Sequence, residues 1–254
     1  MKKQTLFLVI TLLLASLQGF ACDCIPSSLT QKFQKADFIA IVKLVKIRPD
    51  KSDLSYHDAE IKLIKLYKGD RINAIKIHSL VETSCGFLPT ENSTWLIFAY
   101  KWEGKLSFDY CSGSSQLDII EDEGEYPKST GGFKRHNSLQ IESLDFLKRH
   151  KIANLNPQNL AIVPPELESI KGYKNRNRFA VFQVNVDVSK TVTNVTTLRK
   201  FQNEELNKLI TDKFKTELKF GNSLPLTKPA QLFIFCYFYE KEKRYPSFLG
   251  YSDL

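Results

Sequence analysis

The chain has 254 residues, of which 43% are hydrophobic and 12% aromatic. This is enough apolar material for one large or two small packed domains, and it excludes a wholly disordered protein. The formal net charge is +8, and most of it lies in the second half. Residues 155–254 carry a net charge of +5, whereas residues 22–154 carry +1. A basic half favours either an anionic partner or a solvated basic face. Zinc-finger spacing and RNA-binding aromatic motifs are absent, so we expect no nucleic-acid binding.

The first 21 residues have the layout of a cleavable secretory signal. Lys2 and Lys3 precede an apolar run from Leu6 to Leu14, and small residues stand at Gly19 and Ala21. The alternative is an uncleaved anchor, but the apolar run is too short to span a bilayer comfortably. We therefore predict a signal peptide over 1–21. We expect a secreted or periplasmic protein without a membrane span in its mature chain.

The mature chain then begins with the run Cys22-Asp23-Cys24-Ile25-Pro26. Two cysteines one residue apart do not easily pair with each other, because the short spacer strains the disulfide geometry. Each one therefore needs a distant partner or stays free, and the sequence alone does not choose among the pairings. The other cysteines are Cys85, Cys111 and Cys236. Cys236 lies in an apolar strand between two aromatic residues, and we expect it to be a buried, unreactive thiol.

Hydrophobic periodicity predicts a mainly β first domain over residues 22–154. A short helix is expected from Ser27 or Ser28 to Phe33, and a helix over Ser138–His150 follows an acidic, glycine-rich loop over Glu121–Gly132. Between them we expect five strands, with a hairpin turn at Glu103-Gly104. Their ranges are Ala36–Ile47, Ala59–Tyr67, Ala74–His78, Thr94–Tyr100 and Lys105–Tyr110. Strands closing around one core, with a helix against them, indicate a small barrel.

The second half follows a different pattern. Residues 155–176 are rich in Asn and Pro, which predicts a linker. A β-β-α-β module of class α+β is expected over 177–254. Its predicted strands are Phe182–Val188, Thr191–Leu198 and Gln231–Tyr239, and its helix begins after a cap at Asn203 and ends at Gly221.

Three ordered segments of the first domain resemble the tissue inhibitors of metalloproteinases, whose domain is the netrin-like (NTR) module, an OB-type β-barrel. The first segment is the run Cys22–Pro26, followed by a short helix and a long strand. The second is Val81-Glu82-Thr83-Ser84-Cys85-Gly86, similar to the family's Met-Glu-Ser-Val-Cys-Gly. The third is Trp95–Tyr100 with the hairpin and Tyr110-Cys111-Ser112 after it. The resemblance covers about half of the mature chain. It does not extend to the family's third disulfide in this domain or to its cysteine-rich C-terminal domain.

The resemblance implies that Cys22 pairs with Cys85 and Cys24 with Cys111. It also implies that the α-amine and carbonyl of Cys22 chelate the zinc of a metalloproteinase, replacing the water at the metal's open position. Asp23 would then enter the proteinase's specificity pocket, where the family prefers Thr or Ser. A carboxylate in an apolar pocket costs several kcal/mol unless it is paired. The implied partner-binding residues are Cys22, Asp23, Cys24, Ile25, Pro26, Val81, Glu82, Thr83 and Ser84.

The second half resembles, more loosely, the C-terminal domain of TonB-like periplasmic proteins. The similar segments are Phe182–Asp187 and Thr191–Val195, followed by a helix and a final strand. That family docks extended peptides on a sheet edge. The resemblance therefore implies an alternative function, a bacterial envelope scaffold that binds a partner through its C-terminal sheet edge.

Sequence motifs for catalysis are absent. The four histidines at 57, 78, 136 and 150 are scattered, without the spacing of a metal site. A glycine-rich phosphate loop and a Gly-x-Ser-x-Gly motif are also missing. We therefore expect a non-enzymatic binding protein that needs no cofactor and acts on a protein partner.

Overall fold

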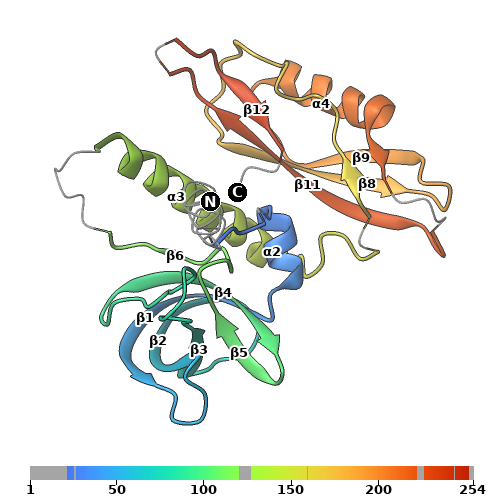
Figure 1. Cartoon of the computed structure of the whole chain (residues 1–254). Coiled ribbons are helices and arrows are strands. Elements are labelled where there is room, and N and C mark those ends of the chain that lie inside the picture. Colours follow the sequence, from blue (N-terminus) through green and yellow to red (C-terminus); the bar gives the residue numbers. More distant parts are fainter. Residues whose placement is uncertain are drawn as a thin grey trace, which may run out of the picture. The chain divides into compact units, whose positions relative to one another are not determined.

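The computed structural model describes residues 22–25, 27–119, 127–158, 160–221, 226–242 and 244–251, with only the backbone described for residues 127–133 (Figure 1). The predicted signal peptide and Pro26 lie outside the described residues. By its internal contacts the chain divides into two compact units. Unit 1 comprises residues 22–25, Ala40–Leu66 and Asp70–Asp118, and unit 2 comprises Ser27–Ile39, Tyr67–Gly69 and the residues from Ile119 onward. Strands dominate the described secondary structure, so the predicted mainly β class is confirmed.

One sheet of six strands runs through unit 1. The strands are β1 (Phe38–Pro49), β2 (Tyr56–Lys68), β3 (Ala74–His78), β4 (Thr94–Trp102), β5 (Lys105–Phe108) and β6 (Ser115–Gln116). Their order is β1-β2-β3-β5-β4-β6, and an additional pairing between β1 and β4 turns five of them into a partly closed ring (Figure 1). The pairing of β3 with β5 is parallel, whereas β2–β3 and β4–β5 are antiparallel.

The interior of this ring is filled by the alternating apolar residues that the sequence indicated. Val42 and Leu44 of β1 are fully buried, while Lys43 between them is only partly covered. The strand predicted over Thr94–Tyr100 is β4, which is buried continuously from Trp95 to Ala99. Because both faces of β4 are covered, its run of apolar residues does not alternate.

A short helix, α2 (Leu29–Lys35), belongs to unit 2. Ser28, and not Ser27, caps it in a capping box with Gln31. At the other end the Lys68 ammonium donates hydrogen bonds to the Phe33 and Gln34 carbonyls, at 2.8 and 3.1 Å. Gly69 follows with φ of +87°, and a Cβ there would lie 2.6 Å from the Asp37 carbonyl oxygen. Only glycine fits this position, which directly follows β2.

The larger part of unit 2 is a four-stranded antiparallel sheet of order β12-β11-β8-β9. Its strands are β8 (Phe179–Val186), β9 (Val192–Arg199), β11 (Ala230–Tyr239) and β12 (Phe248–Gly250), beside a two-stranded ribbon of β7 (Ile162–Val163) and β10 (Lys219–Phe220). Helix α4 (Glu204–Glu217) begins after the predicted Asn203 cap. It packs on one sheet face, where the Phe214 ring meets the Phe182 ring edge-on at 5.3 Å.

Helix α3 (Pro127–Arg149) packs against the other face of that sheet. The Phe146 ring makes edge-on contacts with Phe179 of β8 and Phe235 of β11, each at 6.1 Å between centroids. The helix starts eleven residues before its predicted start at Ser138. The loop expected over Glu121–Gly132 is therefore wrong from Pro127 onward, while residues 120–126 lie outside the described residues.

The division into units differs from the domain boundaries that we expected from the sequence. Helix α3 was assigned to the first domain and residues 155–176 to a linker, but contacts place both in unit 2. In the supposed linker, apolar side chains are buried at Leu155, Leu160, Leu167 and Ile170. The Asn and Pro residues correctly indicated irregular backbone in this segment. Apolar side chains that occur every few residues along such backbone can still be buried.

Candidate functional site

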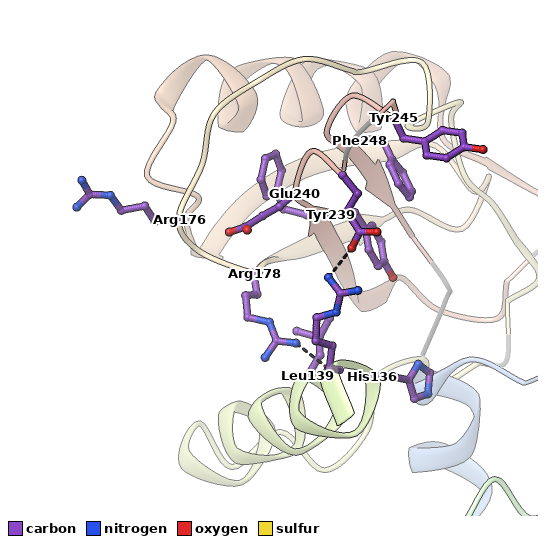
Figure 2. A pocket seen from close by; sticks show the side chains of 11 residues that line it. His136, Leu139, Arg176, Arg178, Tyr239, Glu240, Tyr245 and Phe248 are labelled. Atoms are coloured by element: carbon purple, nitrogen blue, oxygen red, sulfur yellow. Dashed lines mark hydrogen bonds and ion pairs between the residues drawn. The ribbon is translucent and has the colours of Figure 1, made fainter. Parts of the chain in front are cut away.

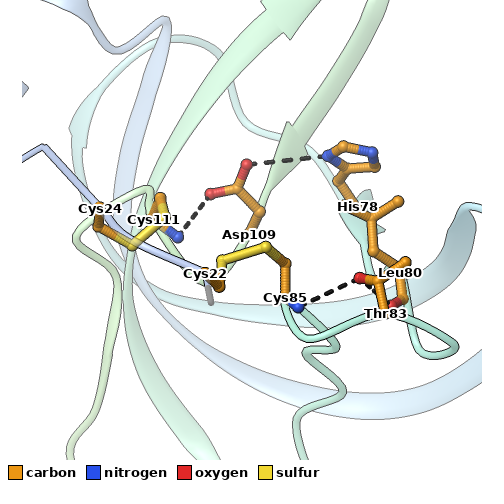
Figure 3. The surroundings of a disulfide bond; sticks show 8 residues. All are labelled: Cys22, Cys24, His78, Leu80, Thr83, Cys85, Asp109 and Cys111. Atoms are coloured by element: carbon orange, nitrogen blue, oxygen red, sulfur yellow. Dashed lines mark hydrogen bonds and ion pairs between the residues drawn. A yellow bond between two sulfur atoms is a disulfide. The ribbon is translucent and has the colours of Figure 1, made fainter. Parts of the chain in front are cut away.

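Two disulfides tie the N-terminal segment of unit 1 to two different loops (Figure 3). Cys22 is bonded to Cys85 in the loop after β3, and Cys24 is bonded to Cys111 in the turn after β5. The Cα–Cα distances are 5.0 and 5.2 Å, within the ordinary disulfide range. The pairing is therefore the one implied by the resemblance. Such bonds are typical of an oxidising extracellular or periplasmic compartment.

The loop that holds Cys85 is fixed by its own hydrogen bonds. Thr83 donates to the Leu80 carbonyl from both its backbone N–H and its hydroxyl, each at 2.9 Å. The Thr83 hydroxyl oxygen in turn accepts from the Cys85 N–H at 3.1 Å. The Phe87 N–H closes the loop onto the Ser79 carbonyl at 2.7 Å. The loop is thus a compact, hydrogen-bonded turn, and Cys22 is bonded to it.

Asp109 organises the turn that holds Cys111. One carboxylate oxygen accepts from the Cys111 N–H at 2.9 Å, and the other lies 3.8 Å from Nδ1 of His78 (Figure 3). The His78 ring stacks on Tyr56. Burial and the Asp109 charge raise the pKa of Tyr100 to about 12. Its phenol therefore keeps its proton at neutral pH, and it donates to the Ser112 carbonyl at 3.3 Å.

The Cys22–Cys85 bond brings together the two segments that were predicted to bind a partner. We call residues 22–25 and 81–84 the N-terminal ridge. Asp23, Glu82, Thr83 and Ser84 are exposed, while the cysteines themselves are half-buried. Two apolar side chains of the ridge are also exposed, Ile25 by 92% and Val81 by 47%. Both side chains are therefore accessible to a partner. Pro26, the remaining predicted residue, is outside the described residues.

A cavity of about 710 Å³ in unit 2 was not predicted (Figure 2). It lies between α3 and the β11–β12 end of the sheet, and its size is in the range of small-molecule sites. Two of its arginines are already engaged, since Arg178 donates to Glu142 at 2.7 Å and Arg135 pairs with Glu242. Its lining comprises Arg135, His136, Leu139, Arg176, Arg178, Phe238, Tyr239, Glu240, Glu242, Tyr245 and Phe248. These residues come from four separate segments, so periodicity in any one of them did not reveal the cavity.

Cys236 is a fully buried, unbonded thiol, as expected, and burial raises its pKa, so it stays protonated. Within the described ranges, histidine, cysteine and carboxylate side chains form no group of three able to hold a metal ion. The helices of the described chain include none long and apolar enough to cross a membrane.

The search of protein-family models and of curated proteins found no match to this chain. The features of this chain that point to a function are therefore the geometry of the ridge and the resemblance in the sequence.

Proposed function

We propose that this protein is a secreted or periplasmic, non-enzymatic inhibitor of a zinc metalloproteinase, with unit 1 as an NTR-like module. The observation that carries the proposal is the double attachment of the N-terminal segment. The two disulfides hold Cys22 and Cys24 against two loops and leave Asp23 and Ile25 exposed between and beside them. A partner thus meets a surface that is ordered before binding, which reduces the entropy lost on association.

The strand arrangement supports an OB-type barrel as the scaffold. In the ring, β1 pairs with both β2 and β4, and β3 pairs in parallel with β5. A five-stranded, partly open Greek-key barrel has strands that leave and rejoin the sheet in this way. The loops that carry Cys85 and Cys111 follow β3 and β5, and the parallel pairing places the ends of these two strands side by side.

The inhibitory chemistry requires that the signal peptide is removed directly before Cys22. The α-amine nitrogen and the carbonyl oxygen of one residue then form a five-membered chelate with zinc, and they displace the catalytic water from the open position. Only the neutral amine binds metal, and an α-amine is half-protonated at roughly pH 8. Inhibition should therefore strengthen as the pH rises from 6 to 8.

An N-terminal extension tests this proposal. One alanine added before Cys22 displaces the amine by about 3.8 Å, and zinc coordination tolerates only about 0.2 Å. We expect mature protein to inhibit at least one enzyme in a panel of zinc endoproteinases, and the extended protein to inhibit none. Thermal unfolding should be the same for both, because both disulfides remain possible. If the mature protein inhibits none at micromolar concentration, or if both forms inhibit equally, the proposal is wrong.

A second candidate function is the envelope scaffold, which the open edge of β9 favours. In the described sheet β9 pairs only with β8, so its outer edge is available to an extended peptide. This function would be indifferent to an N-terminal extension. The scaffold function predicts that Leu198→Lys, which puts a charge at an exposed position of this edge, abolishes binding of the partner peptide to β9. The matched control is Lys208→Glu, a charge change at an exposed position of α4.

A further inference from the structure

The cavity of unit 2 has an apolar wall. Strands β11 and β12 pair Tyr239 with Phe248, and the two rings are stacked with their centroids 4.7 Å apart (Figure 2). Both residues are only half-buried, so part of this ring pair remains accessible. Leu139 of α3 adds an aliphatic side chain to the same cavity. Walls of this kind cover the apolar body of a small molecule in most ligand sites.

The segments that contain the lining residues are strongly basic. Residues 134–142, 174–178 and 238–248 contain eight lysines and arginines but only three carboxylates. These 25 residues carry a formal net charge of +5, whereas the whole chain carries +8. A cleft with a positive field raises the local concentration of anionic ligands. The cavity therefore combines an apolar wall with a preference for negative charge.

Two of the lining arginines are poorly placed to bind an anion in the cavity. Arg178 donates to the Glu142 carboxylate at 2.7 Å and to the Ser138 hydroxyl at 2.9 Å. It also donates to the Arg135 carbonyl at 2.7 Å, so its guanidinium holds α3 against the segment before β8. Arg176 is exposed, and in Figure 2 its side chain extends away from the apolar wall. It contributes to the positive field without reaching that wall.

The Arg135 guanidinium, in contrast, can exchange its partner. Its ion pair with Glu242 joins α3 to the segment between β11 and β12, and the two side chains are 66% and 57% exposed. An ion pair so accessible to water contributes little to stability. A ligand carboxylate that replaces Glu242 can form two parallel hydrogen bonds with the guanidinium. The displaced Glu242 side chain then remains hydrated.

We propose that this cavity binds a free, single-chain amphipathic carboxylate of the fatty-acid type, with its chain against the apolar wall and its head group on Arg135. The chain loses contact with water on binding, which is the main favourable contribution. The carboxylate fixes its orientation, and Glu242 competes with it for Arg135. All lining residues belong to unit 2, so this binding does not depend on the N-terminal ridge or on inhibition of a proteinase.

Isothermal titration calorimetry of the mature protein with dodecanoate, below its micelle concentration, tests the inference. Acetate supplies the head group without the chain, and dodecyltrimethylammonium supplies the same chain with the opposite charge. Arg135→Gln and Glu242→Gln each remove one side of the ion pair. Arg149→Gln is the matched control, because Arg149 is an exposed arginine of the same helix outside the cavity lining. Circular dichroism melts show whether each variant is folded.

We expect dodecanoate to bind in the micromolar range, and acetate and dodecyltrimethylammonium to show no binding at these concentrations. Arg135→Gln should weaken dodecanoate binding by about tenfold. Glu242→Gln should strengthen it by about threefold, because the competing carboxylate is gone. Arg149→Gln should leave it unchanged. The opposite signs are diagnostic, since an ion pair that only stabilised the fold would make the first two variants behave alike.

Four results would overturn the inference. The first is the absence of dodecanoate binding to the mature protein at roughly 1 mM, a concentration at which even weak binding is detected. The second is equally tight binding of dodecyltrimethylammonium. The third is a change of affinity in the same direction, or no change, in Arg135→Gln and Glu242→Gln. The fourth is binding to vesicles of anionic phospholipid without binding of free dodecanoate, which would assign the basic surface to a membrane instead.

Discussion

Removal of the Cys22–Cys85 bond should destabilise unit 1 and leave unit 2 unchanged. The perturbation is the double variant Cys22→Ser and Cys85→Ser, which leaves no unpaired partner thiol. Both residues belong to unit 1, and both are half-buried, so serine at these positions remains partly hydrated. The effect should therefore come chiefly from the lost cross-link and not from a buried hydroxyl.

The magnitude follows from the loop that the bond closes. The two cysteines are separated by 63 residues in sequence. The second disulfide shortens this path, because the chain also connects Cys22 to Cys85 through Cys24, Cys111 and the residues between 85 and 111. The effective loop is then roughly 28 residues, for which the chain-entropy relation gives about 3.5 kcal/mol at 25 °C. Without the second bond, the same relation gives about 4 kcal/mol for the full loop.

Tryptophan fluorescence isolates this effect. The chain has two tryptophans, and both Trp95 and Trp102 lie in β4 of unit 1. At a urea dependence of about 2 kcal/mol per molar, the fluorescence midpoint should fall by more than about 1 M. Cys236→Ala is the control, because that thiol is in the core of unit 2, and it should leave the fluorescence midpoint in place. An unchanged midpoint in the double variant would refute the reasoning that the bond stabilises unit 1.

Three further predictions concern the rest of the chain. Asn207 is buried and exchanges two hydrogen bonds with the Phe201 backbone, at 2.8 and 2.9 Å. Its replacement by alanine should lower the free energy of unfolding of unit 2 by about 2 kcal/mol in circular dichroism melts, whereas Asn194→Ala, on exposed β9, should change little. A fragment of residues 177–254 lacks the buried side chains of Leu160, Leu167 and Ile170, so its NMR spectrum should be poorly dispersed. The longer fragment 127–254 contains them and should give a dispersed spectrum. A dispersed spectrum from the shorter fragment would contradict this prediction. Hydrogen bonds, chiefly from Lys76 and also from Ser52, hold the pKa of Asp50 below its ordinary value. Unit 1 should therefore lose stability as the pH falls below about 4. In fluorescence-monitored unfolding, Asp50→Asn should make the stability of unit 1 depend less on pH in this range.

Local sequence patterns predicted well those elements whose formation depends on neighbouring residues. Strand Ala74–His78 was predicted with the bounds it has, because its apolar residues alternate. The Asn203 cap was also predicted, and its side chain accepts from the N–H groups of Glu205 and Leu206. The start of α3 was missed. Gly131 and Gly132 lower the helix propensity of the first turns of α3, yet these turns are helical in the structure.

Long-range features were harder to predict from the sequence. Cysteine spacing left the disulfide pairing open, and only the family resemblance selected the bonds that the structure contains. The β7–β10 ribbon has two residues in each strand, too few for a periodicity to appear. In the Cys85 loop, the Thr83 side chain bonds to the Leu80 and Cys85 backbone. The sequence motif does not by itself predict this geometry.

The most direct test of the proposed inhibition is whether binding requires the partner's metal. One zinc endoproteinase that the mature protein inhibits is immobilised in its zinc-loaded form and, on a second surface, after removal of the zinc by a chelator. Surface plasmon resonance then gives the affinity of the mature protein for each. If the Cys22 amine and carbonyl coordinate the metal, affinity should fall at least a hundredfold on the zinc-free surface and return when zinc is added back. Equal affinity for the two surfaces would contradict zinc chelation by the N-terminal ridge.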